Sequence, residues 1–133
     1  MTPPLIVAID QGTSSTKVIV VDSDGAVVAR GSAPLALLTP RPGWVEHRAD
    51  DIIASAHAAV AEAVRGLDSS RVVAVGISNQ RESLVLWDRT TGEAVSPVLS
   101  WQDRRTVDLC EELLAAGHGL RVREVSGLPL DPM

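Results

Sequence analysis

Three short apolar runs separated by turn residues occupy the start of the chain. Val, Ile and Ala dominate residues 5–9, 17–21 and 26–30. A stretch rich in Gly, Thr and Ser joins the first two runs, and residues 23–25 (Ser-Asp-Gly) are typical of a tight turn before the third. Apolar runs of this length, bounded by turns, predict three strands in an antiparallel meander.

Residues 50–67 carry apolar side chains at the spacing of an amphipathic helix. Asp50 and Asp51 stand at its start, where the helix dipole favours negative charge. The apolar positions are Ile52, Ile53, Ala56, Val60, Ala63, Val64 and Leu67. Because residues 71–78 again read as a buried strand, the segment predicts a right-handed strand–helix–strand crossover.

The second half of the chain has shorter patterned segments. Residues 32–42 contain three prolines and predict a surface excursion. Residues 84–87 predict a strand in a hairpin, which residues 90–92 (Thr-Thr-Gly) close. Residues 103–116 predict a second helix, and a short helical or irregular piece is expected up to Ser126. The apolar face of that second helix would contain Val107, Cys110, Leu113 and Leu114.

Composition narrows the class of protein. With 133 residues, 45% hydrophobic and 22% charged, the chain fits one soluble globular domain without a linker. A net charge of −5, with no Phe or Tyr, argues against a nucleic-acid partner. The apolar run at residues 5–9 is too short for a membrane span, and the lone Cys110 suits a reducing cytoplasm and excludes an intramolecular disulfide.

Residues 10–17 (DQGTSSTK) join two predicted strands and have the chemistry of a phosphate site. Gly12 lets backbone amides approach an anion, Thr13 and Ser14 begin a run of hydroxyl donors, and Lys17 adds a positive charge. Asp10 ends the first strand and can hold Mg²⁺ through its waters. On composition alone, a polar hairpin turn without a ligand is the simpler interpretation.

Two further segments carry polar groups suited to a polyhydroxylated ligand. Residues 79–82 (NQRE) combine amides with the guanidinium of Arg81 and the carboxylate of Glu82, which can grip adjacent hydroxyls. Trp101, predicted at the opening of a helix, offers a flat apolar wall. The alternatives are an exposed turn with an ordinary ion pair and a tryptophan that caps the core. His47, in a loop, is interpreted as a structural hydrogen-bonding residue rather than a general base.

Five segments match the motifs of a known family in one order: residues 9–13, 42–47, 76–82, 101–106 and 127–132. Together they resemble the N-terminal part of the FGGY family of carbohydrate kinases, and within it the kinases that act on glycerol. Five motifs in one order are far more specific than any one of them.

The resemblance implies an α/β, ribonuclease H-like fold, shared with actin, hexokinase and the Hsp70 ATPase domain. Such a fold has a mixed sheet with an antiparallel meander and flanking helices, and ATP binds between two such domains. Residues 1–133 would be the N-terminal portion of the first, substrate-side domain, incomplete at its C-terminus. The nucleotide-side domain and the catalytic base, an aspartate, would lie beyond Met133, so we expect no catalytic residue here and no activity of this chain alone.

The resemblance also assigns site residues. Asp10 matches the magnesium position, held through water, while Gly12 and Thr13, with Ser14 and Lys17 beside them, match the loop that binds the phosphates of ATP. On the acceptor side Arg81, Glu82 and Trp101 match positions that contact the substrate, and Met133 matches a tyrosine of its pocket. Two departures stand out, namely Met133 in place of that tyrosine and Lys17 in place of an arginine.

The function implied is ATP- and Mg²⁺-dependent phosphorylation of a hydroxyl of glycerol or a similar polyol or sugar. The alternatives are a kinase for xylulose or gluconate, although those carry a different motif in place of residues 79–82, a non-catalytic kinase-like binding module, and an actin-like ATPase. The expected partner is a small molecule, with no nucleic acid and no membrane, and a homo-oligomer stays open. Because adjacent residues on a strand point to opposite faces, joint use of Arg81 and Glu82 predicts irregular backbone just after Ser78.

Overall fold

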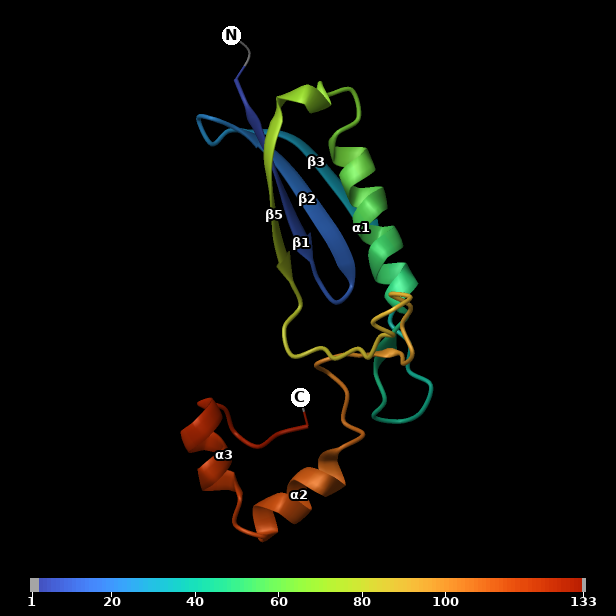
Figure 1. Cartoon of the computed structure of the whole chain (residues 1–133), viewed down its shortest axis with the longest axis vertical. Helices are drawn as coiled ribbons and strands as arrows, with labels where there is room; N and C mark the ends of the chain where they lie inside the picture. Colours follow the sequence, from blue (N-terminus) through green and yellow to red (C-terminus); the bar gives the residue numbers. More distant parts are fainter. Residues whose placement is uncertain (1–2, 133) are drawn as a thin grey trace.

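The computed structural model describes residues 3–132 and is built on a four-stranded mixed sheet (Figure 1). Its strands are β1 (Leu5–Gln11), β2 (Ser15–Asp22), β3 (Val27–Pro34) and β5 (Val72–Asn79). The first three pair antiparallel, and β5 lies parallel to β1, which gives the order β3-β2-β1-β5. The predicted meander and the strand–helix–strand connection are confirmed.

Helix α1 (Ala49–Ala63) packs on β2 and β3 with a face of small residues. Its buried positions are Ser55, Ala59 and Ala63. The helix lies so close to β3 that a Cβ at Gly31 would be 2.1 Å from the Ala59 carbonyl oxygen. The core between helix and sheet consists of Leu5, Val7, Val18, Val20, Ala33, Ala59 and Ala63.

This close packing corrects the predicted helix face and end. Only small side chains fit where the helix passes over Gly31, and Ala59 and Ala63 lie there. Ile53, expected in the core, is 56% exposed. The prediction is confirmed for Ala63, which lies in the core, and for Val60, Val64 and Leu67, which pack against it. The helix ends at Ala63 rather than Leu67, because the chain turns at Gly66, whose φ is 77°, into the short 3₁₀ helix η1 (Ser69–Arg71).

The first residues of the predicted surface excursion belong to the sheet. Strand β3 continues to Pro34, and Leu35 after it is buried. The Leu35 N–H donates to the Ser14 carbonyl at 2.9 Å, and the Ser32 N–H donates to the Glu62 carboxylate at 2.7 Å. Because these donors have partners, the chain leaves the sheet only after Leu35.

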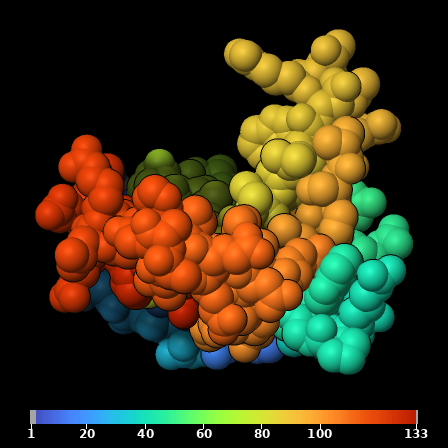
Figure 2. Space-filling model, turned by 90° about the horizontal axis from the view of Figure 1, so that it is seen from below, coloured from blue at the N-terminus to red at the C-terminus, as the bar shows by residue number. Residues whose placement is uncertain are grey.

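The predicted strand at residues 84–87 is not formed. That segment makes only two isolated bridges, Leu84 to Leu99 and Trp87 to Ala94. The ladder is interrupted because the Leu86 N–H bonds the Ser96 hydroxyl, at 3.0 Å, instead of a backbone carbonyl. The hairpin turn itself is confirmed, with Gly92 at φ 75°, and the hairpin stands away from the body of the molecule, in yellow in Figure 2. The sequence also missed the small pair β4 (Glu46–His47) and β6 (Val98–Leu99).

Two helices follow the hairpin and lie below the sheet in Figure 1. Helix α2 (Val107–Ala115) begins four residues later than predicted, because Asp103 and Arg105 are engaged in contacts outside it. The predicted apolar face of α2 is confirmed for Cys110, which is buried, and wrong for Leu114, which is exposed. The expected short helical piece is α3 (Gly119–Ser126). Within residues 3–132, no helix has the length and apolar character needed to cross a membrane.

Candidate functional site

The carboxyl ends of β1 and β5 bring two of the predicted motifs together. Gln11 and Asn79 are register partners at these ends. Directly after them, the Gln80 N–H donates to the Gln11 carbonyl at 2.8 Å. The β1–β2 turn (residues 12–14) and the β5 turn (residues 80–83) therefore lie side by side at one edge of the sheet.

The β1–β2 turn is tight and anchored. The Gly12 N–H donates to the Ser15 carbonyl at 3.0 Å, and a Cβ at Gly12 would lie only 3.2 Å from that oxygen. Leu35 holds the Ser14 carbonyl from the other side. Within residues 3–132 the backbone N–H groups of Thr13 and Ser14 have no acceptor, so they are free to bind an anion.

Asp10 and Lys17 sit opposite each other on β1 and β2. Both are exposed, on the sheet face turned away from α1, because strand residues alternate and the neighbouring odd positions of β1 are covered by the helix. The described residues contain no cluster of three His, Cys, Asp or Glu side chains that could enclose a metal. A single exposed carboxylate suits a Mg²⁺ ion that keeps most of its waters.

The β5 turn has the irregular backbone expected after Ser78. The strand ends at Asn79, and Glu82 adopts a φ of 58°, in the left-handed region that non-glycine residues seldom occupy. Arg81 and Glu82 are both exposed, and within residues 3–132 neither takes part in an ion pair. The ordinary ion pair considered for this turn is thus not formed, and both charges face solvent.

Trp101 connects the two turns. It lies in a turn six residues before α2 rather than at the opening of a helix, and it is 40% exposed. Its indole Nε1–H donates to the Thr13 hydroxyl at 2.9 Å, and its backbone N–H donates to the Ser83 hydroxyl at 3.3 Å. Trp101 therefore links the β1–β2 turn to the β5 turn, while part of its indole surface stays exposed to solvent.

Met133 lies outside the described residues. Two positions before it, Asp131 accepts a hydrogen bond from Arg104 at 2.9 Å. The Arg104 N–H in turn donates to the Gly43 carbonyl at 2.7 Å. The last family-like motif is thus tied to the segments around Gly43 and Trp101.

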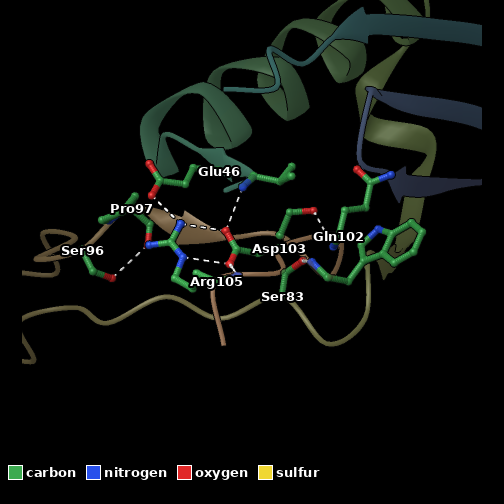
Figure 3. Close-up of polar contacts among 10 residues, drawn as sticks. Glu46, Ser83, Ser96, Pro97, Gln102, Asp103 and Arg105 are labelled. Carbon is green, nitrogen blue, oxygen red and sulfur yellow. Dashed lines mark hydrogen bonds and ion pairs between the residues drawn. The ribbon is translucent and has the colours of Figure 1, made fainter. Parts of the chain in front are cut away.

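A cluster that sequence reasoning missed joins the start of β4 to the segment after Trp101 (Figure 3). The Arg105 guanidinium donates to both carboxylate oxygens of Asp103, at 2.8 and 2.7 Å, and to Glu46 at 2.6 Å. It also stacks on Trp44, 3.9 Å from the ring centroid. We call Trp44, Glu46, Asp103 and Arg105 the Arg105 clamp. The sequence signal that could have revealed it is the presence of acidic and basic residues in two of the matching motifs, residues 42–47 and 101–106.

The clamp is electrostatically satisfied. Hydrogen bonds from Arg105 are the main cause that lowers the pKa of Asp103 to about 2, with the Val45 N–H, 2.7 Å away, adding to it. The same contacts raise the pKa of Arg105. Asp103 is 4% exposed, so its charge is neutralised inside the protein rather than offered to a ligand.

Neither His47 nor Cys110 has the setting of a catalytic group. His47 is fully buried, and its Nδ1 lies 2.7 Å from the Ala36 carbonyl, to which it donates. This confirms the structural interpretation of His47. Cys110 is a buried free thiol.

A hollow lies beside the two turns, on the α1 side of the sheet. It has a volume of about 1010 Å³, and its wall includes Gln11 at the end of β1 and Gln80 and Ser83 of the β5 turn. Most of its remaining wall is apolar, including Ile52, Ile77 and Trp87. Arg81, Glu82 and Trp101 are not among its lining residues, so the hollow is distinct from the surface that these three residues form.

Comparison with known proteins gives one consistent result. Residues 5–133 match the family described as "FGGY family of carbohydrate kinases, N-terminal domain". The chain is 41% identical over 133 residues to a glycerol kinase of Stenotrophomonas maltophilia (strain K279a), covering 98% of this chain and 27% of that protein. It is also 41% identical over 128 residues to a glycerol kinase of Burkholderia pseudomallei (strain K96243), covering 95% and 26%. The chain thus spans about a quarter of the length of these relatives.

Solved structures share the fold. Gluconate kinase from Lactobacillus acidophilus superposes with a TM-score of 0.91 at 21% identity, covering 98% of this chain and 26% of that one. Plasmodium falciparum glycerol kinase with ADP gives 0.81 at 29% identity, covering 91% and 25%. The α/β fold predicted from the motifs, of the actin and hexokinase type, is confirmed.

Proposed function

This chain belongs to the FGGY family of carbohydrate kinases, and we propose that it is the N-terminal, acceptor-side portion of an ATP-dependent kinase that phosphorylates glycerol or a similar polyol. One observation carries the proposal. Trp101 joins the anion-ready β1–β2 turn to the charged β5 turn through its hydrogen bonds to Thr13 and Ser83. A phosphoryl donor and a hydroxyl acceptor must meet at such a junction for transfer to occur.

The acceptor would lie against the β5 turn. Arg81 can donate two hydrogen bonds to neighbouring hydroxyls, and Glu82 can accept from them. Arg81 and Glu82 form no ion pair within residues 3–132, and this supports the role because both charges are available to a ligand. The open part of the Trp101 indole would pack against the carbon chain of the ligand.

The phosphates of ATP would lie at the β1–β2 turn. The free N–H groups of Thr13 and Ser14, the close approach allowed by Gly12, and the charge of Lys17 suit an anion. Asp10 would hold Mg²⁺ through water, and the ion, when bound, neutralises phosphate charge during transfer. Within residues 3–132 Asp10 forms no hydrogen bond or ion pair with Arg81, Glu82 or Trp101, so it should serve turnover rather than acceptor affinity.

We propose glycerol rather than xylulose or gluconate as the acceptor, because the relatives at 41% identity are glycerol kinases. Gluconate kinase and xylulose kinase from Lactobacillus acidophilus superpose closely, but at 21% and 22% identity they support the fold alone. Met133 stands where a tyrosine is expected, so Met133→Tyr should favour glycerol over less hydroxylated acceptors.

The catalytic base and the second wall of the nucleotide site are proposed to lie beyond Met133. The 133-residue chain alone should therefore release no ADP with any polyol in a coupled assay. Turnover that disappears in Asp10→Ala would contradict this part of the proposal.

Two experiments test the function itself. The reading frame beyond the Met133 codon should encode an aspartate base and a second domain; a stop codon there would favour a non-catalytic binding module instead. In parallel, a chimera can join this chain to the part of the Stenotrophomonas maltophilia glycerol kinase that follows the matched region. We expect this chimera to phosphorylate glycerol faster than xylulose or gluconate.

Within the chimera, Asp10→Ala should lower kcat strongly and leave the glycerol KM nearly unchanged, because Asp10 serves the metal and phosphates. A change mainly in the glycerol KM would contradict that role. A folded chimera with no turnover on any of the three acceptors would contradict the proposed function.

A further inference from the structure

Five residues form a ring around the junction of the two turns, closed by four hydrogen bonds and by the chain from Gln11 to Thr13. Gln80 Nε2–H donates to Gln11 Oε1 at 3.4 Å, and Gln80 Oε1 accepts from the Ser83 hydroxyl at 3.0 Å. The Ser83 oxygen accepts the Trp101 backbone N–H, and the Trp101 indole reaches Thr13. Thr13 is two residues from Gln11 along the chain, which completes the ring.

Ser83 is the link in this ring that no apolar residue can replace. Its hydroxyl donates one hydrogen bond and accepts another at the same time, so it joins two elements far apart in the sequence. It also follows directly on Glu82, whose left-handed backbone needs support from its surroundings. Figure 3 shows Ser83 in contact with the backbone that leads to Gln102.

We infer that Ser83 is a positioning residue that holds the β5 turn against Trp101 and thereby fixes Arg81 and Glu82 relative to the β1–β2 turn. The inference rests on the proposed function, because it assigns these groups to one acceptor and one phosphoryl donor. Loss of the hydroxyl should let the β5 turn move, so the acceptor is bound less well. The indole of Trp101 should also shift relative to Thr13.

The first test is the NMR signal of the Trp101 indole N–H in the 133-residue chain, assigned by its disappearance in Trp101→Phe. Thr13→Val should move this signal because it removes the acceptor. Ser83→Ala should move it as well, although Ser83 does not touch the indole nitrogen. Ser83→Thr, which keeps the hydroxyl, and Ser23→Ala, in the exposed β2–β3 turn, should leave it in place. The indole signals of Trp44 and Trp87 report whether each variant is folded.

The second test is acceptor kinetics in the chimera. Ser83→Ala should raise the glycerol KM about fivefold to tenfold, the loss expected for one or two hydrogen bonds, with kcat within about twofold. Ser83→Thr should restore the KM. A merely structural defect would lower the active fraction, and with it kcat, and would leave the KM unchanged.

The outcomes separate the inference from the function. If Arg81→Ala weakens acceptor binding but Ser83→Ala changes neither the KM nor the indole signal, the positioning role is overturned and the function stands. If Arg81→Ala has no effect on any acceptor, the proposed acceptor site itself is wrong. Should Ser83→Ala fail to fold, Thr13→Val breaks the same ring at its other end and must raise the KM, or the coupling of the two turns is overturned.

Discussion

The Arg105 clamp and the β5 turn are built from the same kinds of residues but use them in opposite ways. In the clamp, Arg105 contacts two carboxylates and a tryptophan ring, and its side chain is only 18% exposed. In the β5 turn, Arg81 and Glu82 are neighbours, yet both face solvent without an ion pair within residues 3–132. Charges neutralised inside the protein stabilise the fold, whereas charges left free are available to a ligand.

The Arg105 clamp and the β5 turn also differ in backbone geometry. The clamp is held by regular hydrogen bonds, such as that from the Val45 N–H to Asp103, and needs no unusual conformation. The β5 turn contains Glu82, the non-glycine residue with positive φ within residues 3–132. Strain of this kind persists where the surroundings hold it and is common at ligand sites. Removing a clamp residue should therefore cost stability, and changing the β5 turn should cost acceptor binding.

The largest expected effect is that of Arg105→Ala on stability. The substitution leaves Asp103 buried without its partner, so the free energy of unfolding should fall by about 3 kcal/mol or more. Arg104→Ala is the matched control, because its pair with Asp131 is partly exposed and should contribute less than about 1 kcal/mol. Urea unfolding of the 133-residue chain measures both, and equal losses would contradict the distinction between the two arginines.

Glu82→Ala should show the reverse pattern in the chimera. A ligand hydroxyl loses its acceptor, so affinity for glycerol should fall about tenfold or more. The midpoint of urea unfolding should not fall. Glu93→Ala, in the exposed hairpin, is the control and should change neither quantity. A loss of stability without a change in glycerol affinity would place Glu82 with the clamp.

Acid should weaken the clamp in a defined pH range. The pKa of Asp103 is about 2 in the folded chain and 3.8 for an unperturbed group. Because the folded value is the lower one, the stabilisation is fully present above pH 4 and is lost as the pH falls toward 2. The loss attributable to Asp103 should be about 2 kcal/mol. In Asp103→Asn this part of the pH dependence should be absent, and an unchanged acid profile would show that Asp103 does not carry it.

The smallest expected effect is a gain in stability. Glycine adopts a φ of 58° without steric cost, so Glu82→Gly should raise the free energy of unfolding by up to about 1 kcal/mol. The same variant should lose glycerol affinity in the chimera. Glu124→Gly, in helix α3, is the opposite control and should lower stability. A loss of stability in Glu82→Gly would mean that the left-handed backbone at this position is not a source of strain.

The strands of the meander, strand β5 and helix α1 were accessible from sequence, because apolar periodicity and turn residues act locally. The irregular backbone after Ser78 followed from a simple geometric demand, namely that Arg81 and Glu82 reach one ligand. Parallel pairing of β1 with β5 then placed the turns side by side. That meeting of the turns depends on the pairing of two strands far apart in the sequence, and it was not predicted.

The missed features depend on contacts far apart in the sequence. Ala59 is buried because Gly31, more than twenty residues earlier, leaves room there only for a small side chain. Ser55 is buried against Thr16 of β2, with which it shares a hydrogen bond. Arg105 contacts Glu46 across 59 positions, a pairing that no local pattern contains. No local pattern contains the hydrogen bond between Trp101 and Thr13 either. That bond shows that Trp101 links two segments of the chain and does not only cover the core.

The central claim is that the free charges of the β5 turn bind the acceptor, and Arg81 tests it most directly. For the Arg81→Ala chimera, kcat/KM for glycerol and the midpoint of urea unfolding are measured on the same preparation. The control is Arg89→Ala, in the exposed hairpin, measured in the same way. We predict at least about a tenfold fall in kcat/KM with an unchanged midpoint for Arg81→Ala, and no change in either for the control. An unchanged kcat/KM for Arg81→Ala would contradict the claim and place the acceptor elsewhere.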